Sequence, residues 1–362
     1  MNNRSVAITI NGQRCTQDEL NLLIAEKLSS PHLPDWEDEL FTFLKHWFSN
    51  SQTIQAHTSG STGEPTSIEL PKAVMVKSAQ RTIEYFGLNK GNRILLSLPC
   101  RFIAGKMMVV RAIIGKMNLV TADPSSDFEV LLNHTFDFGA MVPNQVFKLL
   151  ESDAGKEKLE NIRNLLIGGS AISATLEEHV SQLNSRVAST YGMTETASHI
   201  AIRELSGENR SDIYHCLPGI SVTMGENECL QIHVPERHEP LHTNDIAEVL
   251  SSNSFRILGR ADDVINSGGI KYWPETIEKK LQTLISARFV ISSLPDQMLG
   301  EKLVLVIEGT LIDTKGILQN TAKLLSPFER PKSIYFLETF PQTPNGKLRR
   351  NEIKQLINNL LQ

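Results

Sequence analysis

The chain has 362 residues, of which 40% are hydrophobic and 21% charged, and its formal net charge is -5. This balance is typical of a globular protein of two or three domains, and the net charge gives no overall sign of nucleic-acid binding. No apolar run is long enough to span a membrane, the N-terminus lacks a signal-peptide core, and the cysteines form no CxxC pair. We therefore expect a cytoplasmic protein with reduced thiols.

Strand and helix patterns alternate over residues 73–189. Hydrophobic periodicity predicts helices over 17–28, 36–48, 73–86, 103–115, 143–151 and 175–183. Short apolar runs predict strands over 5–10, 93–99, 118–121, 138–142, 164–167 and 186–189. This alternation predicts an α/β fold with a parallel sheet, whose ligand loops follow the carboxyl ends of the strands.

After residue 220 the pattern changes twice. Alternating residues predict strands over 221–224, 229–234, 246–250 and 255–258, which would form a β-rich subdomain. Helices at 275–285, 314–325 and 351–361 then mix with strands at 302–307 and 332–336. We predict a large α/β domain over 1–261, which includes the β-rich subdomain, and a small α+β domain over 262–362.

The first stretch that carries chemistry is HTSGSTGEP, residues 57–65. Glycines let backbone N–H groups converge on an anion, and hydroxyl groups add donors for phosphate oxygens. The stretch does not fit the common P-loop, since Glu64 follows Gly63 where that motif needs lysine. It indicates a loop over nucleotide phosphates, and a surface linker is the alternative.

The second stretch is STYGMTET, residues 189–196. Tyr191 can offer a flat ring to a base, Thr194 a hydroxyl to a phosphate, and Glu195 a hard oxygen ligand to Mg²⁺. The alternative is a capped helix start, with Thr194 or Thr196 as the N-cap.

The third stretch is LGRADDVINSGGIK, residues 258–271, and it follows HTND at residues 242–245. Asp245 can accept both ribose hydroxyls, Arg260 can add a donor, and Gly268-Gly269 would let a narrow ligand pass close to the backbone. The alternative is a polar turn between domains.

The fourth stretch is PQTPNGKLRR, residues 341–350, in which two prolines and a glycine present Lys347. A lysine can meet a carboxylate or a developing phosphate charge. A basic surface turn is the alternative.

Taken in this order, the four stretches resemble the adenylate-forming family of acyl-CoA synthetases, luciferases and peptide-synthetase adenylation domains. The resemblance covers roughly residues 57–350. It implies two half-reactions: a carboxylate attacks the α-phosphorus of ATP to give an acyl-adenylate, and a thiol, usually that of coenzyme A, then displaces AMP. The implied cofactors are ATP, Mg²⁺ and coenzyme A.

The resemblance also implies roles for individual residues. The phosphate loop corresponds to Thr58, Ser59, Gly60, Ser61, Thr62 and Gly63. The adenine wall corresponds to Gly168, Gly169, Ser170, Tyr191, Gly192 and Met193. Thr194 and Glu195 correspond to the phosphate and Mg²⁺ contacts, Asp245 and Arg260 to the ribose contacts, Asp262 to the domain hinge, Gly268 and Gly269 to the pantetheine tunnel, and Lys347 to the lysine required for adenylation.

Two features depart from the family pattern. The phosphate loop usually ends in Pro-Lys, whereas Thr66 follows Pro65 here and Lys72 is the next lysine. Only 57 residues precede Thr58, so we expect the first part of the large domain to be reduced. A second subunit could supply the missing walls of the acid pocket, so a homodimer is an alternative to a monomer.

The stretch LPCRFIAGKMM, residues 98–108, takes the place where the family builds part of its acid pocket. With YGMTETASHIA it resembles the short family members that act on o-succinylbenzoate in menaquinone biosynthesis. That acid keeps a second carboxylate, which a cation would hold. Arg101, Lys106 and His199 are the candidates by position. The alternative for Arg101 and Lys106 is a pair of solvated charges at a helix start.

Other functions stay open at this point. One is a stand-alone adenylation enzyme for another aryl or fatty acid, and another is a catalytically degenerate nucleotide-binding regulator. A metal enzyme is the weakest alternative, because Pro235 and Pro240 interrupt any helix that would align His233, His238 and His242.

Overall fold

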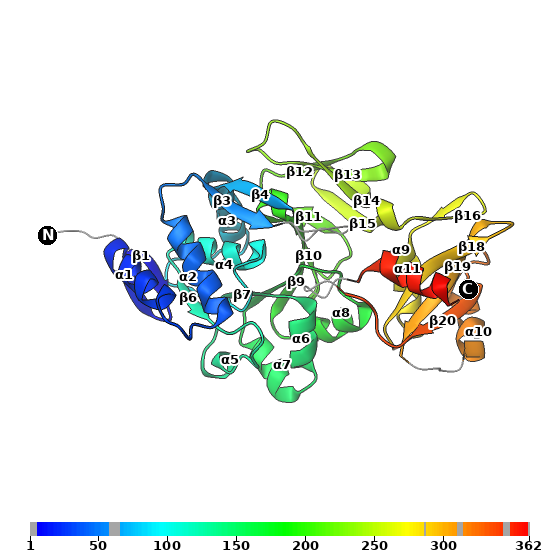
Figure 1. Ribbon diagram of the computed structural model, residues 1–362, viewed down its shortest axis with the longest axis horizontal. Coiled ribbons are helices and arrows are strands. Elements are labelled where there is room, and N and C mark those ends of the chain that lie inside the picture. Colours follow the sequence, from blue (N-terminus) through cyan, green and yellow to red (C-terminus); the bar gives the residue numbers. More distant parts are fainter. Residues whose placement is uncertain (1–5, 58–65, 286, 310–313, 343–347, 361–362) are drawn as a thin grey trace. The chain divides into compact units, whose positions relative to one another are not determined.

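A computed structural model describes residues 6–57, 66–285, 287–309, 314–342 and 348–360. The backbone packs into two compact units (Figure 1). The first unit contains residues 1–169, 179–220 and 234–236, and the second contains residues 170–178, 221–233 and 237–362. Among the described residues, no helix combines the length and the apolar character that a membrane span requires.

The first unit is built on a mostly parallel sheet. Its strands lie in the order β11-β10-β9-β8-β7-β5-β6-β1-β2, and parallel pairing runs from β9 across to β1. The bounds are β1 (Val6–Ile10), β2 (Gln13–Thr16), β5 (Arg93–Leu96), β6 (Asn118–Thr121), β7 (Phe138–Met141), β8 (Asn164–Ile167), β9 (Arg186–Met193), β10 (Ser198–Glu204) and β11 (Tyr214–Cys216).

Helices cover both faces of this sheet. The chain moves from β5 through α4 to β6 in one direction, and from β7 through α6 and α7 to β8 in the other. Because such crossovers are right-handed, α4 lies on the opposite face from α6 and α7 (Figure 1). The direction reverses between β5 and β7, and ligands bind at the carboxyl ends of strands beside such a point. The segment 97–102, which follows β5, therefore lies where a ligand is expected.

The first unit also contains a small hairpin. Strands β3 (Thr53–His57) and β4 (Ser67–Pro71) pair on either side of residues 58–65, with His57 opposite Ser67. The helix bounds are α1 (Gln17–Leu28), α2 (Asp35–Trp47), α3 (Lys72–Tyr85), α4 (Ile103–Gly115), α5 (Val130–Asn133), α6 (Pro143–Leu150) and α7 (Asp153–Glu160). The helix α8 (Ala174–Ser181) has residues in both units.

The second unit contains an antiparallel ribbon and a separate smaller sheet. The ribbon runs β12 (Ser221–Met224), β13 (Cys229–His233), β14 (Leu241–Ser251), β15 (Ser254–Arg260). The sheet contains β16 (Ile265–Ser267), β17 (Ile270–Tyr272), β18 (Phe289–Asp296), β19 (Gly300–Glu308) and β20 (Ser333–Leu337). Its helices are α9 (Pro274–Leu281), α10 (Thr314–Leu324) and α11 (Arg350–Asn359).

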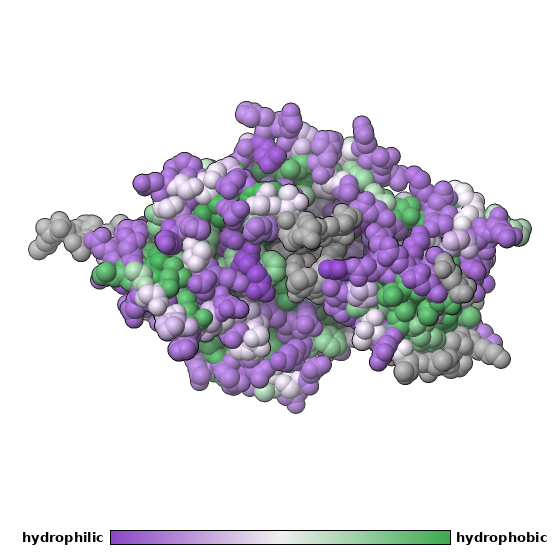
Figure 2. All heavy atoms as spheres, in the orientation of Figure 1, coloured by the Kyte–Doolittle hydropathy of each residue, from purple (hydrophilic) through white to green (hydrophobic). Residues whose placement is uncertain are grey.

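Both faces of the smaller sheet are packed. Successive residues of a strand point to opposite faces, so Leu305 joins a core with Ile277 of α9, whereas Val304 and Val306 join a core with Ile353 of α11. In Figure 2 the face in view is mostly hydrophilic, and its apolar side chains lie in small groups, one of them over β19 and β20.

The predicted fold class is confirmed, and helices 17–28 and 103–115 have the predicted bounds. The hairpins β3–β4 and β16–β17 and the strand β18 were not predicted. The helix predicted over 275–285 ends at Leu281. The backbone packing groups β12–β15 with the C-terminal segment, and the proposed domain boundary at Asp262 stays a prediction.

Candidate active site

The STYGMTET stretch ends a strand and enters a tight turn. Tyr191–Met193 complete β9, Thr194–Thr196 form one turn of 3₁₀-helix, and β10 begins at Ser198. The Met193 N–H donates to Thr196 Oγ1 at 3.0 Å. Ala197 and Ser198 then have φ of 51° and 96°, which is unusual for residues with a Cβ. The N-cap of this turn is Met193 and not Thr194 or Thr196, and Thr194 and Glu195 directly follow β9.

Gly192 is required where β9 passes β10. A Cβ at this position would lie 2.4 Å from the Ser198 carbonyl oxygen and 2.5 Å from His199 Cα. Gly168 at the end of β8 is similarly confined, because a Cβ there would lie 2.1 Å from Thr190 Oγ1. Gly169 has φ of 89°, which favours glycine. Half of the predicted adenine wall, Gly168, Gly169 and Gly192, is therefore at positions where the local geometry disfavours a side chain.

Glu195 is the predicted Mg²⁺ ligand, and its side chain is half-buried. Among the residues that the structure describes, no three His, Cys, Asp or Glu side chains gather into a metal cage. Proteins usually hold Mg²⁺ through one or two carboxylates together with substrate phosphates, and the role of Glu195 stays a prediction.

A buried guanidinium lies beside the same turn. Arg111 of α4 is 2% exposed, and among the described residues it has no carboxylate partner. Its Nη2 donates to Ser198 Oγ at 3.2 Å and to His199 Nδ1 at 3.4 Å, and its Nε is buried without a hydrogen-bond acceptor. Burial lowers the pKa of Arg111 to about 9. Local sequence patterns did not reveal this residue, because Arg111 stands in a helix of otherwise mostly apolar residues.

The three cations that the sequence suggested for the second carboxylate differ in environment. His199 is buried among α3, α4 and β10, and burial followed by the Arg111 charge holds its pKa well below the usual value. Lys106 is also buried, so it is not a solvated charge, and its Nζ donates to the carbonyls of Cys100 at 2.8 Å and Arg101 at 3.3 Å. The Arg101 side chain is 55% exposed and pairs with Glu39 at 2.8 Å.

The second unit brings the predicted ribose contacts together. Asp245 on β14 is the register partner of Arg260 on β15, and Arg260 Nη1 donates to Asp245 Oδ1 at 3.0 Å. Arg260 Nη2 also donates to Asp262 Oδ2 at 3.0 Å. The predicted ribose pair and the predicted hinge residue therefore form one hydrogen-bonded group.

The glycine pair of this unit forms a tight turn. Gly268 and Gly269 have φ of 62° and 81° and join β16 to β17. Positive φ at both central positions suits a two-residue hairpin and accounts for both glycines without a ligand. Their proposed place beside pantetheine stays a prediction.

A cluster of three carboxylates surrounds Arg350 at the start of α11. Its Nη1 and Nη2 donate to the two oxygens of Glu278, each at 2.7 Å, while its Nε lies 3.7 Å from Asp263 and 3.6 Å from Glu275. Asp263 follows the predicted hinge residue directly. Arg350 is the last residue of the PQTPNGKLRR stretch, whose local pattern did not predict this contact.

Two predicted elements lie outside the described residues: Lys347 and the phosphate loop Thr58, Ser59, Gly60, Ser61, Thr62 and Gly63. The flanking backbone is described. Besides the β3–β4 pairing, Gln342 bridges to Leu348, and the Arg349 N–H donates to the Pro341 carbonyl at 3.0 Å. Backbone pairing therefore joins the described residues that flank each segment.

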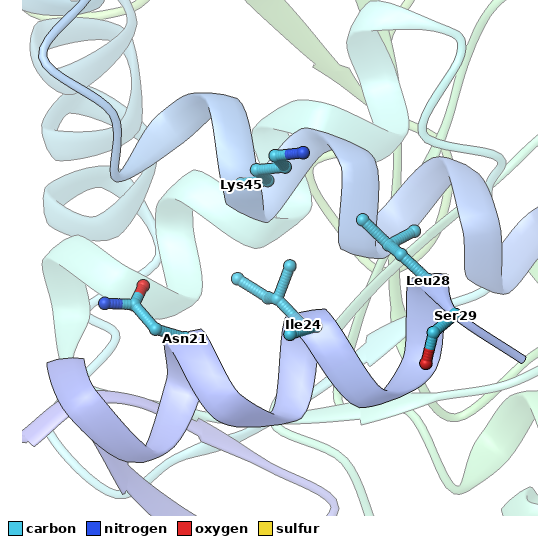
Figure 3. A pocket seen from close by; sticks show the side chains of 6 residues that line it. Asn21, Ile24, Leu28, Ser29 and Lys45 are labelled. Atoms are coloured by element: carbon cyan, nitrogen blue, oxygen red, sulfur yellow. The ribbon is translucent and has the colours of Figure 1, made fainter.

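The first unit also has a hollow of about 400 Å³ between α1 and α2, lined by Asn21, Ile24, Ala25, Leu28, Ser29 and Lys45 (Figure 3). Lys45 is the one charged side chain in its lining. None of the residues that the sequence analysis assigned to a site lines this hollow, and we assign it no function.

The fold is that of adenylate-forming enzymes. The o-succinylbenzoate CoA synthetase of Bacillus subtilis, solved with its acyl-adenylate intermediate, superposes with a TM-score of 0.76 over 98% of this chain and 96% of its own, at 19% identity. The amino-acid sequence identifies the family to which the chain belongs. The model of the AMP-binding enzyme family matches residues 49–241, more than half of the chain, and the chain belongs to that family.

Two other relatives agree with this assignment. A crystal structure of an acyl-CoA synthetase (AMP-forming)/AMP-acid ligase II-like protein from Dyadobacter fermentans is 34% identical, with a TM-score of 0.61 over 93% of this chain and 98% of that one. The 2-succinylbenzoate–CoA ligase of Lactococcus lactis is 23% identical over 82% of this chain, which spans 70% of that enzyme.

Proposed function

We propose that the chain is an ATP-dependent, AMP-forming acid–CoA ligase that acts on o-succinylbenzoate. The family membership and the relatives named for this acid support the reaction. The observation that carries the choice of acid is Arg111, a buried cation beside the YGMTET turn with no carboxylate partner among the described residues.

A buried guanidinium without an anion is costly, because desolvation disfavours its charge and leaves N–H donors unsatisfied. Binding of an anionic group of the substrate during turnover would offset this cost. A carboxylate accepts two parallel N–H bonds from a guanidinium. The acid proposed here has two carboxylates, so one can react while Arg111 holds the other. A monocarboxylic acid would leave the Arg111 charge uncompensated.

The remaining roles follow the arrangement of each unit. ATP supplies the AMP leaving group, and Mg²⁺ would be held by Glu195 together with phosphate oxygens, beside the hydroxyl of Thr194. Asp245, held by Arg260, would accept the ribose hydroxyls. Lys347 would stabilise the charge that develops on the α-phosphate, and rotation at Asp262 would then exchange it for the Gly268-Gly269 face.

The proposal is tested by pyrophosphate release with Mg-ATP and a panel of acids, with and without coenzyme A, and by mass detection of the thioester. We expect turnover with o-succinylbenzoate and accumulation of its CoA ester. Turnover with another aryl or fatty acid alone would keep the reaction and discard the acid. If no acid gives pyrophosphate although the folded protein binds ATP, the chain is a nucleotide-binding protein without ligase activity.

The variant Arg111→Met tests the choice of acid independently of the reaction type. We expect this variant to raise KM for o-succinylbenzoate by about 10²-fold, since hydrogen bonds to charged groups are worth about 1.5–3 kcal/mol. Its KM for an analogue whose unreacted carboxylate is a methyl ester should change by less than about threefold. Equal losses on both acids would show that Arg111 does not bind the second carboxylate.

A further inference from the structure

His199 connects Arg111 to the helix on its other side. Its Nδ1 lies 3.4 Å from Arg111 Nη2, and its Nε2 lies 3.1 Å from Thr82 Oγ1 of α3. Thr82 Oγ1 in turn donates to the Ser78 carbonyl at 3.3 Å. Three elements of the first unit, α3, α4 and β10, thus meet in one buried polar chain.

The donors and acceptors of these side chains fix the direction of each hydrogen bond in this polar chain. His199 Nδ1 lies 3.4 Å from both Arg111 Nη2 and Ser198 Oγ. A guanidinium has only donors and a hydroxyl can also donate, so we take Nδ1 as the acceptor of this group. The imidazole proton is then on Nε2, which donates a hydrogen bond to Thr82 Oγ1, and the Thr82 hydroxyl donates a hydrogen bond to the Ser78 carbonyl. The chain requires a neutral ring, which agrees with a pKa held well below the usual value of histidine by burial and by the Arg111 charge.

Few contacts orient the head group of Arg111. The strongest described acceptors are Ser198 Oγ and His199 Nδ1, while Met108 Sδ at 3.6 Å is a weak acceptor and Nε has none. Ser198 itself has an unusual positive φ. A guanidinium binds a carboxylate through two parallel bonds only when its plane is correctly oriented. Loss of His199 would leave Ser198 as the principal acceptor that orients this plane.

We propose that His199 is a positioning residue, which orients Arg111 through Nδ1 and so sets the preference of the enzyme for an acid with a second carboxylate. This inference rests on the proposed function, because it takes Arg111 to be the group that contacts the acid. It differs from direct binding by His199, because a buried neutral ring whose two nitrogens are engaged has no free donor for a carboxylate.

The test compares two substitutions of His199. Asparagine can place an acceptor near the position of Nδ1, whereas leucine has similar bulk and no acceptor. For o-succinylbenzoate we expect His199→Leu to raise KM about tenfold with kcat within about twofold, and His199→Asn to stay within about threefold of the native KM. For the methyl-ester analogue, both variants should stay within about threefold.

The variant Thr82→Val tests the tautomer of His199 that the hydrogen bonds imply. It removes the acceptor of Nε2–H with little change in volume, so the ring can take the tautomer that no longer accepts from Arg111. We expect KM for the diacid to rise about two- to fivefold, and KM for the analogue to stay unchanged. An unchanged KM for the diacid would overturn the inferred tautomer, and thermal unfolding of each variant verifies that it folds.

The outcomes separate the two proposals. If the native enzyme does not prefer the diacid, or Arg111→Met does not abolish that preference, the proposed function is wrong. If Arg111→Met abolishes the preference while His199→Leu preserves it, only the positioning role is overturned. If His199→Leu and His199→Asn raise KM equally for both acids, His199 is a packing residue.

Discussion

The guanidinium of Arg350 makes a two-pronged contact with the carboxylate of Glu278, each nitrogen lying 2.7 Å from its oxygen. One of those oxygens also accepts the Ile291 N–H at 2.7 Å. The pair thereby joins the first turn of α11 to α9 and β18. The pair is largely buried, with 19% and 11% of the two side chains exposed.

This pair predicts a large loss of stability when one partner is removed. Arg350→Met should lower the free energy of unfolding by about 3–5 kcal/mol, because a buried carboxylate is left without its cation. Denaturant unfolding measures the change. The matched control is Arg349→Met, whose side chain is 47% exposed and pairs with Glu352 on the surface; it should cost less than about 1 kcal/mol. Similar losses in the two variants would contradict the burial of Arg350.

Glu275 predicts a pH-dependent stability in the same cluster. Burial, only partly opposed by Arg350, raises the pKa of Glu275 to about 7, and its Oε2 is buried without a hydrogen-bond partner. Between the unfolded value of 4.5 and about 7, the folded state holds a proton that the unfolded state has lost. Stability from this group therefore falls as the pH rises through that window.

Glu275→Gln should remove this dependence. At pH 8 the variant should be more stable than the native protein by about 1–3 kcal/mol, and near pH 4.5 the two should be nearly equal. Unfolding in denaturant at both pH values measures the difference. Glu278→Gln, which weakens the Arg350 pair, should act with the opposite sign at pH 8, and stabilisation by both substitutions would refute this account.

The crossing of β9 and β10 predicts that Gly192 tolerates no side chain. Gly192→Ala places a Cβ 2.4 Å from a backbone oxygen and 2.5 Å from a backbone carbon, so one strand must shift. We expect a loss of about 1–3 kcal/mol and weaker nucleotide binding. In Gly115→Ala the nearest atom is the flexible Met117 Cε at 2.7 Å, so the change should stay below about 1 kcal/mol. Calorimetric unfolding with and without ATP tests both variants.

We predict that substitution of Lys347 affects the first half-reaction and not the second. Lys347→Ala should lower the rate of adenylate formation by at least about 10²–10³-fold, because a charge-stabilising donor is lost. Thiol attack on a supplied acyl-adenylate should be spared, since the proposed rotation at Asp262 removes Lys347 before that step. Pyrophosphate release and thioester formation are measured separately. Equal loss in both assays would argue against two working orientations.

Local patterns were sufficient for much of the fold and for the nucleotide motifs. The apolar period of 103–115 predicted α4 with its observed bounds, and Asp245 and Arg260 were chosen from separate segments that proved to be register partners. Such features depend on residues that are close in sequence or on motifs with restricted backbone chemistry. Local patterns did not predict β3–β4 or β16–β17, because strands of only three to five residues are too short to show a clear periodicity.

By itself, the sequence determined the α/β class, the family and the residue types available for nucleotide chemistry. The tertiary structure alone decided which charges are buried and what they contact. Arg111 is an ordinary helical arginine until α3 and β10 enclose it, and Arg350 is one of several basic residues until α9 brings Glu278 to it. The physical reason is that desolvation and pairing depend on neighbours distant in sequence, and no local pattern encodes them.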